Sequence, residues 1–399
     1  MVALADFTDP VSKARKTRVT QNEVSLSDLF HCFSLTFWKS QVEIANIVSM
    51  QNRREWRQAP ITVCLCVLML LPTLTHAGED NLPFQLKLKS SGPGSGQLYS
   101  VVYPSMGSLM EIQLVSRNRL GLELALQHAF SNLDRLESLI SHYRSGSEVS
   151  RLNYQYREGY IKATHVSEDT IGLLRLSRLF WEETQGAFDS TLGPLSRLWG
   201  FFDGVPTWPG EADLKACMEM VGMRHIEIDF EEKTVRLTRP GMALDFGAIG
   251  KGYAVDQMVG ILRSHGIVNA LISFGGSTHY AIGRPPGQEG WWIFLDESNP
   301  ASKKVLKDKS LSTASNRTQH WVRNGKNYGH ILDPRTGLPT SFLGSVSVVA
   351  STATASDALA TAFVVLGPEG SAEVLSKHPE WEVVFVPHIE FSGTGVKRD

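Results

Sequence analysis

The stretch from 243 to 256, ALDFGAIGKGYAVD, constrains the fold most, because an apolar run passes through three glycines into an amphipathic segment. This order predicts a strand, a tight turn and the start of a helix. Glycines at such a turn let the backbone approach a ligand, and a helix N-terminus favours anionic groups. This stretch alone is compatible with a phosphate site and with an ordinary turn, and other parts of the sequence are needed to distinguish the two.

The composition is that of a globular protein with little net charge. The chain has 399 residues, of which 42% are hydrophobic and 20% charged, and its formal net charge is −2. Nucleic-acid-binding proteins carry a basic surface, and membrane-surface patches are rich in Lys and Arg. We therefore expect neither nucleic acid nor a basic membrane patch among the partners.

The N-terminal region predicts export. An apolar run at 61–74 follows Arg53, Arg54 and Arg57 and ends in the small-residue sequence at 75–77. This pattern is typical of a secretory signal peptide, and the run is short for a membrane span. We expect a signal peptide at 50–77, with 1–49 as a non-native upstream extension or a mis-set start, and a mature protein in the periplasm or cell envelope. Membrane association through an uncleaved segment remains an alternative.

Cysteine usage fits an exported chain without disulfides. Cys32, Cys64 and Cys66 precede the predicted cleavage site, so that Cys217 is left alone in the mature chain. A single cysteine can form neither an internal disulfide framework nor a cysteine-based zinc site.

Strand and helix periodicities alternate without a regular βαβ order or internal repeats. The predicted strands are 99–103, 110–114, 270–274, 291–295, 345–350 and 383–386, with a hairpin across 226–237. The predicted helices are 122–142, 171–183 with Ser167 as N-cap, 250–266, 357–366 and 372–376. We expect an α+β fold, a mixed α/β sandwich, as one catalytic domain at 99–390. A polar linker at 78–98 precedes it and a tail at 391–399 follows.

Asp357 and Thr361 are the first candidate site residues. At i and i+4 on a helix, the carboxylate and the hydroxyl share one face and could hold a hard cation such as Mg²⁺. Asp357 as a first-turn charge is the alternative. The chain has no Walker-type sequence, and the pair Gly275-Gly276 lacks the third glycine of a dinucleotide fingerprint.

His330 and Asp245 could move protons. A histidine acts as acid or base near neutral pH, although a single loop histidine is also common on a solvated surface. Asp245 ends an apolar run, where it could accept hydrogen bonds from the neighbouring glycines or contact a ligand.

Taken together, several segments in order resemble the ApbE family of FAD:protein FMN transferases, over about 103–386. The segments are 188–201, 245–256, Gly275-Gly276, 330–337 and 357–361. In that family, FMN passes from FAD to a threonine hydroxyl of an acceptor protein, with Mg²⁺ bound and AMP released. The resemblance implies the same activity here, with a membrane-bound or periplasmic redox subunit as acceptor.

The resemblance also assigns roles to individual residues. The side chains of Asp357 and Thr361 and the backbone carbonyl of Ala248 match the family's metal ligands. His330 matches a histidine that lies near the reacting phosphate. Contacts to the flavin nucleotide fall on Met106, Tyr143, Ala187, Phe188, Asp189, Asp245, Lys251 and Ile331. Mg²⁺ and Lys251 would neutralise phosphate oxygens, and His330 or Asp245 would take the hydroxyl proton.

The chain departs from the family pattern in two places. Gly275-Gly276-Ser277 stands where Gly-Gly-Asp is common, and 313–316 replaces the commoner Thr-Ser-Gly. These differences concern the flavin pocket or the groove for the acceptor protein. The family pattern therefore does not predict the details of that pocket or the identity of the acceptor. Two alternative functions also remain: a Mg²⁺-dependent FAD pyrophosphatase that yields FMN and AMP, and a non-catalytic periplasmic flavin-binding protein.

Overall fold

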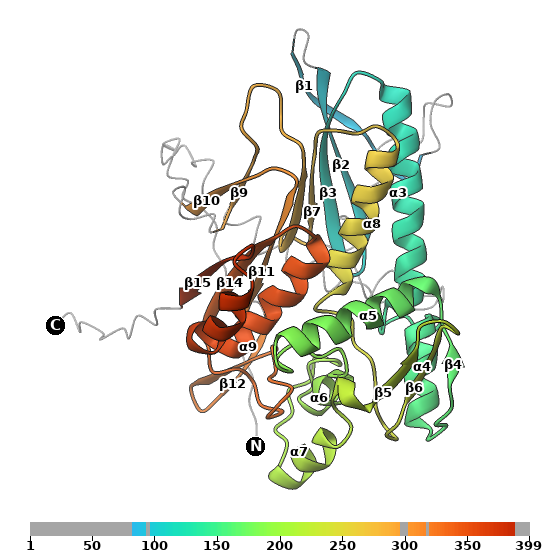
Figure 1. Cartoon of the computed structure of the whole chain (residues 1–399), viewed down its shortest axis with the longest axis vertical. Helices are drawn as coiled ribbons and strands as arrows, with labels where there is room; N and C mark the ends of the chain where they lie inside the picture. The colour runs from blue at the N-terminus through green and yellow to red at the C-terminus, as the bar shows by residue number, and fades with distance from the viewer. Residues whose placement is uncertain (1–81, 93–95, 296–301, 317–318, 388–399) are drawn as a thin grey trace, which may run out of the picture. The chain divides into compact units, whose positions relative to one another are not determined.

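One antiparallel sheet organises the described chain (Figure 1). In spatial order its strands are β1 (Lys87–Gly92), β2 (Gly96–Ser105), β3 (Ser108–Ser116), β7 (Ala270–Phe274), β8 (Thr278–Ile282), β11 (Lys309–Ser315), β14 (Gly344–Ala350) and β15 (Glu382–Pro387). Helices pack on this sheet, which confirms the predicted α+β class.

The computed structural model describes residues 82–92, 96–295, 302–316 and 319–387, within a compact unit that begins at Asp80. The predicted signal peptide (50–77), the upstream extension (1–49) and the tail (391–399) lie outside the described residues, as do the cysteines other than Cys217. Strand β1 lies within the range predicted as a linker, 78–98, and pairs with β2.

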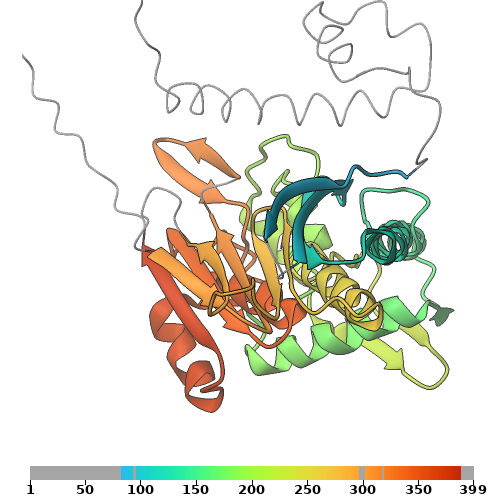
Figure 2. The same ribbon diagram turned by 90° about the horizontal axis from the view of Figure 1, so that it is seen from above.

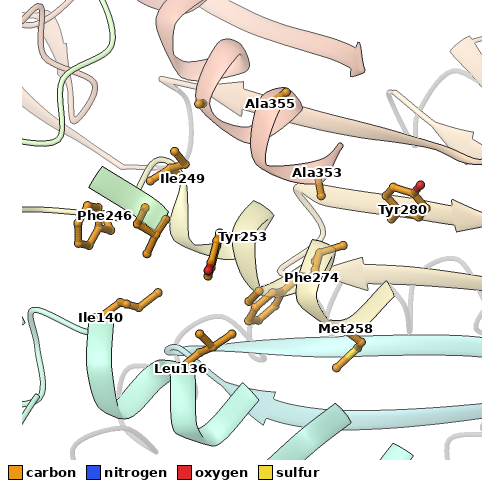
Figure 3. Close-up of a cluster of buried hydrophobic side chains, with 14 of the residues drawn as sticks. Leu136, Ile140, Phe246, Ile249, Tyr253, Met258, Phe274, Tyr280, Ala353 and Ala355 are labelled. Atoms are coloured by element: carbon orange, nitrogen blue, oxygen red, sulfur yellow. The ribbon is translucent and has the colours of Figure 1, made fainter. Parts of the chain in front are cut away.

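Three helices cover one face of the sheet: α3 (Arg119–Ile140), α8 (Gly250–Ser264) and α9 (Ala353–Lys377) (Figure 2). Strand alternation decides which side chains they cover, because Ile272 and Phe274 belong to the core beneath the helices. Leu271 belongs to a second cluster on the other face, with the hairpin of β9 (Trp291–Phe294) and β10 (Lys303–Leu306). Figure 3 shows the larger core around α8.

The segment between α3 and α8 forms a smaller region of short helices and a three-stranded sheet, in the order β4-β6-β5. Its elements are α4 (Glu148–Arg157), β4 (Thr164–His165), α5 (Glu168–Glu183), α6 (Gly193–Leu198), α7 (Glu211–Met218), the 3₁₀ turn η2 (Met223–His225), β5 (Ile226–Asp229) and β6 (Thr234–Leu237). A further hairpin, β12 (His320–Arg323) and β13 (Lys326–Gly329), contributes Trp321 and Tyr328 to a third apolar cluster beside α6 and α7. Buried Cys217 lies in this cluster, and burial raises the pKa of its thiol to about 11.

The predicted elements with strong periodicity are present. Ser167 caps α5 through a hydrogen bond from the N–H of Thr170, as expected for an N-cap serine. Strands β8 and β11 escaped sequence prediction because polar residues occupy buried positions in them. In β11 the hydroxyls of Ser310 and Ser312 each hydrogen-bond with that of Ser356 in α9.

The prediction of a strand leading into α8 is wrong, because residues 242–246 belong to no strand. The side-chain amide of Asn153 satisfies this backbone instead, because it donates to the carbonyl of Leu244 and accepts from the Leu244 N–H. The N–H of Asp245 donates to the carbonyl of Ser190. An amide from α4 thus substitutes for a neighbouring strand.

The glycines of this stretch serve close packing rather than unusual backbone angles, since none of them has a positive φ. A Cβ on Gly252 would lie 2.3 Å from the carbonyl oxygen of Ala353 and 2.8 Å from Cβ of Asp357. Gly252 therefore allows α8 and α9 to meet backbone to backbone.

Helix α9 is the one described helix that is long and apolar enough to cross a membrane by length and composition. It packs on α8, β11 and β14 as a core helix. Gly367, with φ of 67°, and Pro368 break it near its middle, which matches the two predicted helical segments 357–366 and 372–376.

Replacing Gly252 by Ala should lower the free energy of unfolding by about 1–3 kcal/mol, because the new methyl group has no space against α9. Gly260 in the same helix is the matched control, since a Cβ there meets nothing within 4 Å. The change Gly260→Ala should stabilise by about 0.5–1 kcal/mol through helix propensity. Urea unfolding of both variants checks this; equal effects would contradict the packing argument.

Candidate functional site

The N-termini of α8 and α9 meet, and each helix supplies a carboxylate to the other. Asp357 in α9 accepts a hydrogen bond from the N–H of Gly252 at 2.9 Å. Asp256 in α8 accepts from the N–H groups of Ala353 and Thr354, at 2.7 and 2.8 Å, and from the Thr354 hydroxyl. A helix N-terminus stabilises negative charge, so that both carboxylates lie in favourable fields.

Asp357 is the more deeply placed of the candidate ligands. Its side chain also accepts from the hydroxyl of Thr278 at 3.1 Å, and only 8% of the residue is exposed. Burial raises the pKa of this carboxyl group, whereas the positive charge of Lys251 lowers it. Lys251 donates to the hydroxyl of Ser277 at 2.7 Å, at the end of the β7–β8 turn.

Two sheet turns meet at this edge. Gly275 and Gly276 both have positive φ, and the N–H of Gly275 donates to the carbonyl of Leu109 in β3. A Cβ on Gly275 would lie 2.8 Å from Oγ of Ser108 and 3.9 Å from Cδ of Lys251. The β2–β3 turn, the β7–β8 turn and the start of α8 are therefore in contact.

Met106 lies on the β2–β3 turn with φ of 49°. Its N–H and the hydroxyl of Ser105 both donate to Glu137 in α3, each at 3.0 Å. Glu137 thus fixes the turn that carries a predicted flavin contact. Sequence reasoning missed Glu137, whose only signal was its place on the polar side of a helix.

Asp245 stands between α3 and α8. It accepts a hydrogen bond from the N–H of Gly247 at 2.8 Å, and His142 Nδ1 lies 3.2 Å from its Oδ1. The next residue, Tyr143, is 70% exposed. The ring of His142 also lies 4.0 Å from that of Tyr143, so that His142 links the predicted contacts Asp245 and Tyr143.

His330 is held by Gln319, whose carbonyl lies 3.0 Å from Nδ1. A carbonyl only accepts, so that Nδ1 carries the proton and Nε2 carries a lone pair. Burial lowers the pKa of His330, and the positive charge of Lys251 lowers it further. The imidazole is neutral near pH 7 and can accept a proton.

Other predicted contacts are buried in the structure. Ala187, Phe188 and Ile331 are each less than a tenth exposed, and Phe188 packs edge-on against Phe180. Asp189 accepts from the N–H and hydroxyl of Thr191 and from the N–H of Met223. Its side chain stabilises its own loop, and the N–H groups of Ala187 and Phe188 donate to Thr184. The flavin contact expected at 187–189 stays a prediction.

The predicted metal ligands supply only oxygen. Asp357 and Thr361 lie one turn apart on α9, and Ala248 lies two residues before the start of α8. A carboxylate, a hydroxyl and a backbone carbonyl are the ligand types that Mg²⁺ prefers. The described residues contain no group of three or more His, Cys, Asp or Glu side chains that could hold a metal. The donor set fits a hard cation.

Comparison with known sequences decides the family. The model of the ApbE family matches residues 106–385, which is more than half of the chain. The chain belongs to the ApbE family. Similar curated relatives include the FAD:protein FMN transferases of Treponema pallidum, 29% identical over 72% of this chain and 84% of the relative, and of Escherichia coli K12, 29% identical over 62% and 72%.

Solved ApbE structures share the fold. The ApbE protein of Thermotoga maritima superposes with a TM-score of 0.65 at 26% identity, over 73% of this chain and 94% of that one. The flavinyl transferase ApbE of Pseudomonas stutzeri, in its apo form, gives 0.66 at 26% identity over 78% and 94%.

His279 in β8 should make stability depend on pH. Its ring forms a hydrogen bond with the backbone of Gly276, and its Nδ1 has no hydrogen-bond partner among the described residues. Burial lowers the pKa of His279 from 6.5 to about 4. Between these values the unfolded chain binds more protons, so that the free energy of unfolding falls as the pH falls. Between pH 7.5 and 5 this residue should account for a loss of about 2 kcal/mol.

The variant His279→Gln should lose less stability over that pH interval than the wild type, measured by urea unfolding at several pH values. Parallel stability curves for the two proteins would contradict the assignment.

Proposed function

We propose that this member of the ApbE family transfers FMN from FAD to a threonine hydroxyl of an acceptor protein, with Mg²⁺ bound and AMP released. The observation that supports it most is the buried Asp357 carboxylate, held by the Gly252 N–H and the Thr278 hydroxyl beside Lys251. The two transferases named above are similar along most of their length. The export predicted from 50–77 would place the acceptor in the periplasm or cell envelope.

In this proposal, the start of α8 binds the phosphates. The ammonium group of Lys251 has three N–H donors and gives one to Ser277, so that others can reach a pyrophosphate oxygen. The helix N-terminus adds a field that favours negative charge. Both features stabilise the charge that builds up when a pyrophosphate is cleaved.

In this proposal, His330 is the base that accepts the proton of the threonine hydroxyl. The threonine oxygen forms a bond to the FMN phosphorus while the bond from that phosphorus to the bridging oxygen breaks, and AMP leaves with this oxygen. The hydroxyl proton goes to Nε2 of the neutral His330. Asp245 is the less suitable base, because the Gly247 N–H and His142 already bind its carboxylate.

Asp357, Thr361 and the carbonyl of Ala248 would hold Mg²⁺. When bound, the ion would neutralise phosphate oxygens as a Lewis acid. The protein's own contribution is to fix the carboxylate: Gly252 and Thr278 hold its two oxygens, and the contact between α8 and α9 keeps Asp357 next to Lys251.

The deciding experiment incubates the purified protein with FAD, Mg²⁺ and an acceptor that carries a threonine in a flavinylation-type segment. In-gel flavin fluorescence of the acceptor supports transfer. Free FMN and AMP without a labelled acceptor would instead indicate a pyrophosphatase, and unchanged bound FAD would indicate a binding protein.

The variant Asp357→Asn should lower flavin transfer at least about a hundredfold, because it removes the charge of the proposed metal ligand while keeping its shape. The matched control is Asp229→Asn, since Asp229 also accepts backbone N–H bonds, from Glu231 and Glu232, but on the exposed β5–β6 hairpin. It should transfer as the wild type does. Full activity of Asp357→Asn at limiting Mg²⁺ would refute the metal site.

A further inference from the structure

A stack of two aromatic rings lies beside the site, and one of them is exposed. Tyr143 and Phe202 have ring centroids 5.4 Å apart and an interplanar angle of 15°. His142 lies against both rings, at 4.0 Å from Tyr143 and 5.5 Å from Phe202. Through the contact of His142 with Asp245, the stack is fixed to the segment that leads into α8.

Phe202 is in turn held from α6. The guanidinium carbon of Arg197 lies 4.9 Å from the centre of the Phe202 ring, within the range of a cation–π contact. The N–H of Phe202 donates to the carbonyl of Ser196. Nearby, Gly200 has φ of 75°, and a Cβ there would lie 1.6 Å from the carbonyl oxygen of Val205. The loop that carries Phe202 is therefore closely packed.

Tyr143 stacks on Phe202 and is still 70% exposed, so that most of its side chain stays accessible. An open tyrosine ring next to a phosphate-binding helix start is suited to stack on a flat ring joined to a phosphate. Without Phe202, an exposed tyrosine side chain beyond the end of α3 would sample several rotamers. Ordering it at binding would then weaken the affinity.

We propose that Phe202, held by Arg197, is a positioning residue that keeps the ring of Tyr143 oriented for stacking on the isoalloxazine of FAD. This inference rests on the proposed function, because it takes FAD as the ligand. It adds Phe202 and Arg197, to which the sequence analysis gave no individual role, to the determinants of flavin affinity. Phe202 acts through Tyr143, whereas the phosphate-binding residues act on the ADP part of FAD.

The test compares the binding of FAD, FMN and ADP to the full chain and to Phe202→Leu, in the presence of Mg²⁺. An aromatic pair is worth roughly 0.5–1.5 kcal/mol. Phe202→Leu should therefore weaken FAD and FMN binding about two- to thirteenfold, reduce the quenching of flavin fluorescence and leave ADP binding unchanged. KM for FAD should rise with little change in kcat, because the contact is equal in ground and transition states. Phe202→Trp should restore flavin affinity.

The matched control is Trp292→Leu in β9. Trp292 is another exposed aromatic residue with a cation over its ring, Lys303 at 4.2 Å, but it lies on the β9–β10 hairpin. It should bind all three ligands as the wild type does. Arg197→Gln should weaken flavin binding in the wild type and add nothing to Phe202→Leu, because Arg197 acts through Phe202.

The outcomes separate this inference from the proposed function. Equal weakening of FAD, FMN and ADP binding by Phe202→Leu, or no weakening at all, would overturn the role of Phe202 while transfer by the wild type still stands. A wild-type chain that binds neither FAD nor FMN would overturn the proposed function itself.

Discussion

The structure depends on the contact between the starts of α8 and α9. Two helix N-termini with like partial charges would repel each other if nothing compensated them. Here Asp256 and Asp357 do so reciprocally, each from the second turn of one helix to the first turn of the other. Gly252 makes this possible, because any side chain there would meet the Ala353 carbonyl. The absence of a side chain at Gly252 thus allows the short distance between α8 and α9 at the candidate site.

The two carboxylates have different surroundings, which separates their roles. Burial raises the pKa of Asp256, and the two backbone N–H bonds and the hydroxyl bond that it accepts from α9 oppose this rise. Asp357 has one backbone donor and one hydroxyl donor, and Asp256 adds a negative charge that raises its pKa. A buried carboxylate with fewer donors gains more from a nearby cation. Asp256 suits a structural role, and Asp357 suits a ligand.

The sequence predicted the elements whose periodicity is strong. It could not predict pairings that depend on distant side chains. Asn153 replaces a strand partner for Leu244, and Glu137 fixes Met106, in both cases across a separation that no local pattern records. The polar strand β11 was not predicted for the same reason, since the hydroxyls of Ser310 and Ser312 bond with Ser356 of α9, far away in the sequence.

The candidate site divides between rigid and adjustable parts. The phosphate side lies on helix starts and short turns, where the Ser277 hydroxyl holds Lys251 and the Gly252 N–H holds Asp357. The ring side depends on side chains, because Tyr143 is exposed and takes its orientation from Phe202 and His142. A diphosphate has the same shape in every nucleotide, whereas the ring identifies the flavin. Selectivity for the flavin would therefore reside in the part of the site that the family motifs describe least, and it can vary between relatives without disturbing the contact between α8 and α9.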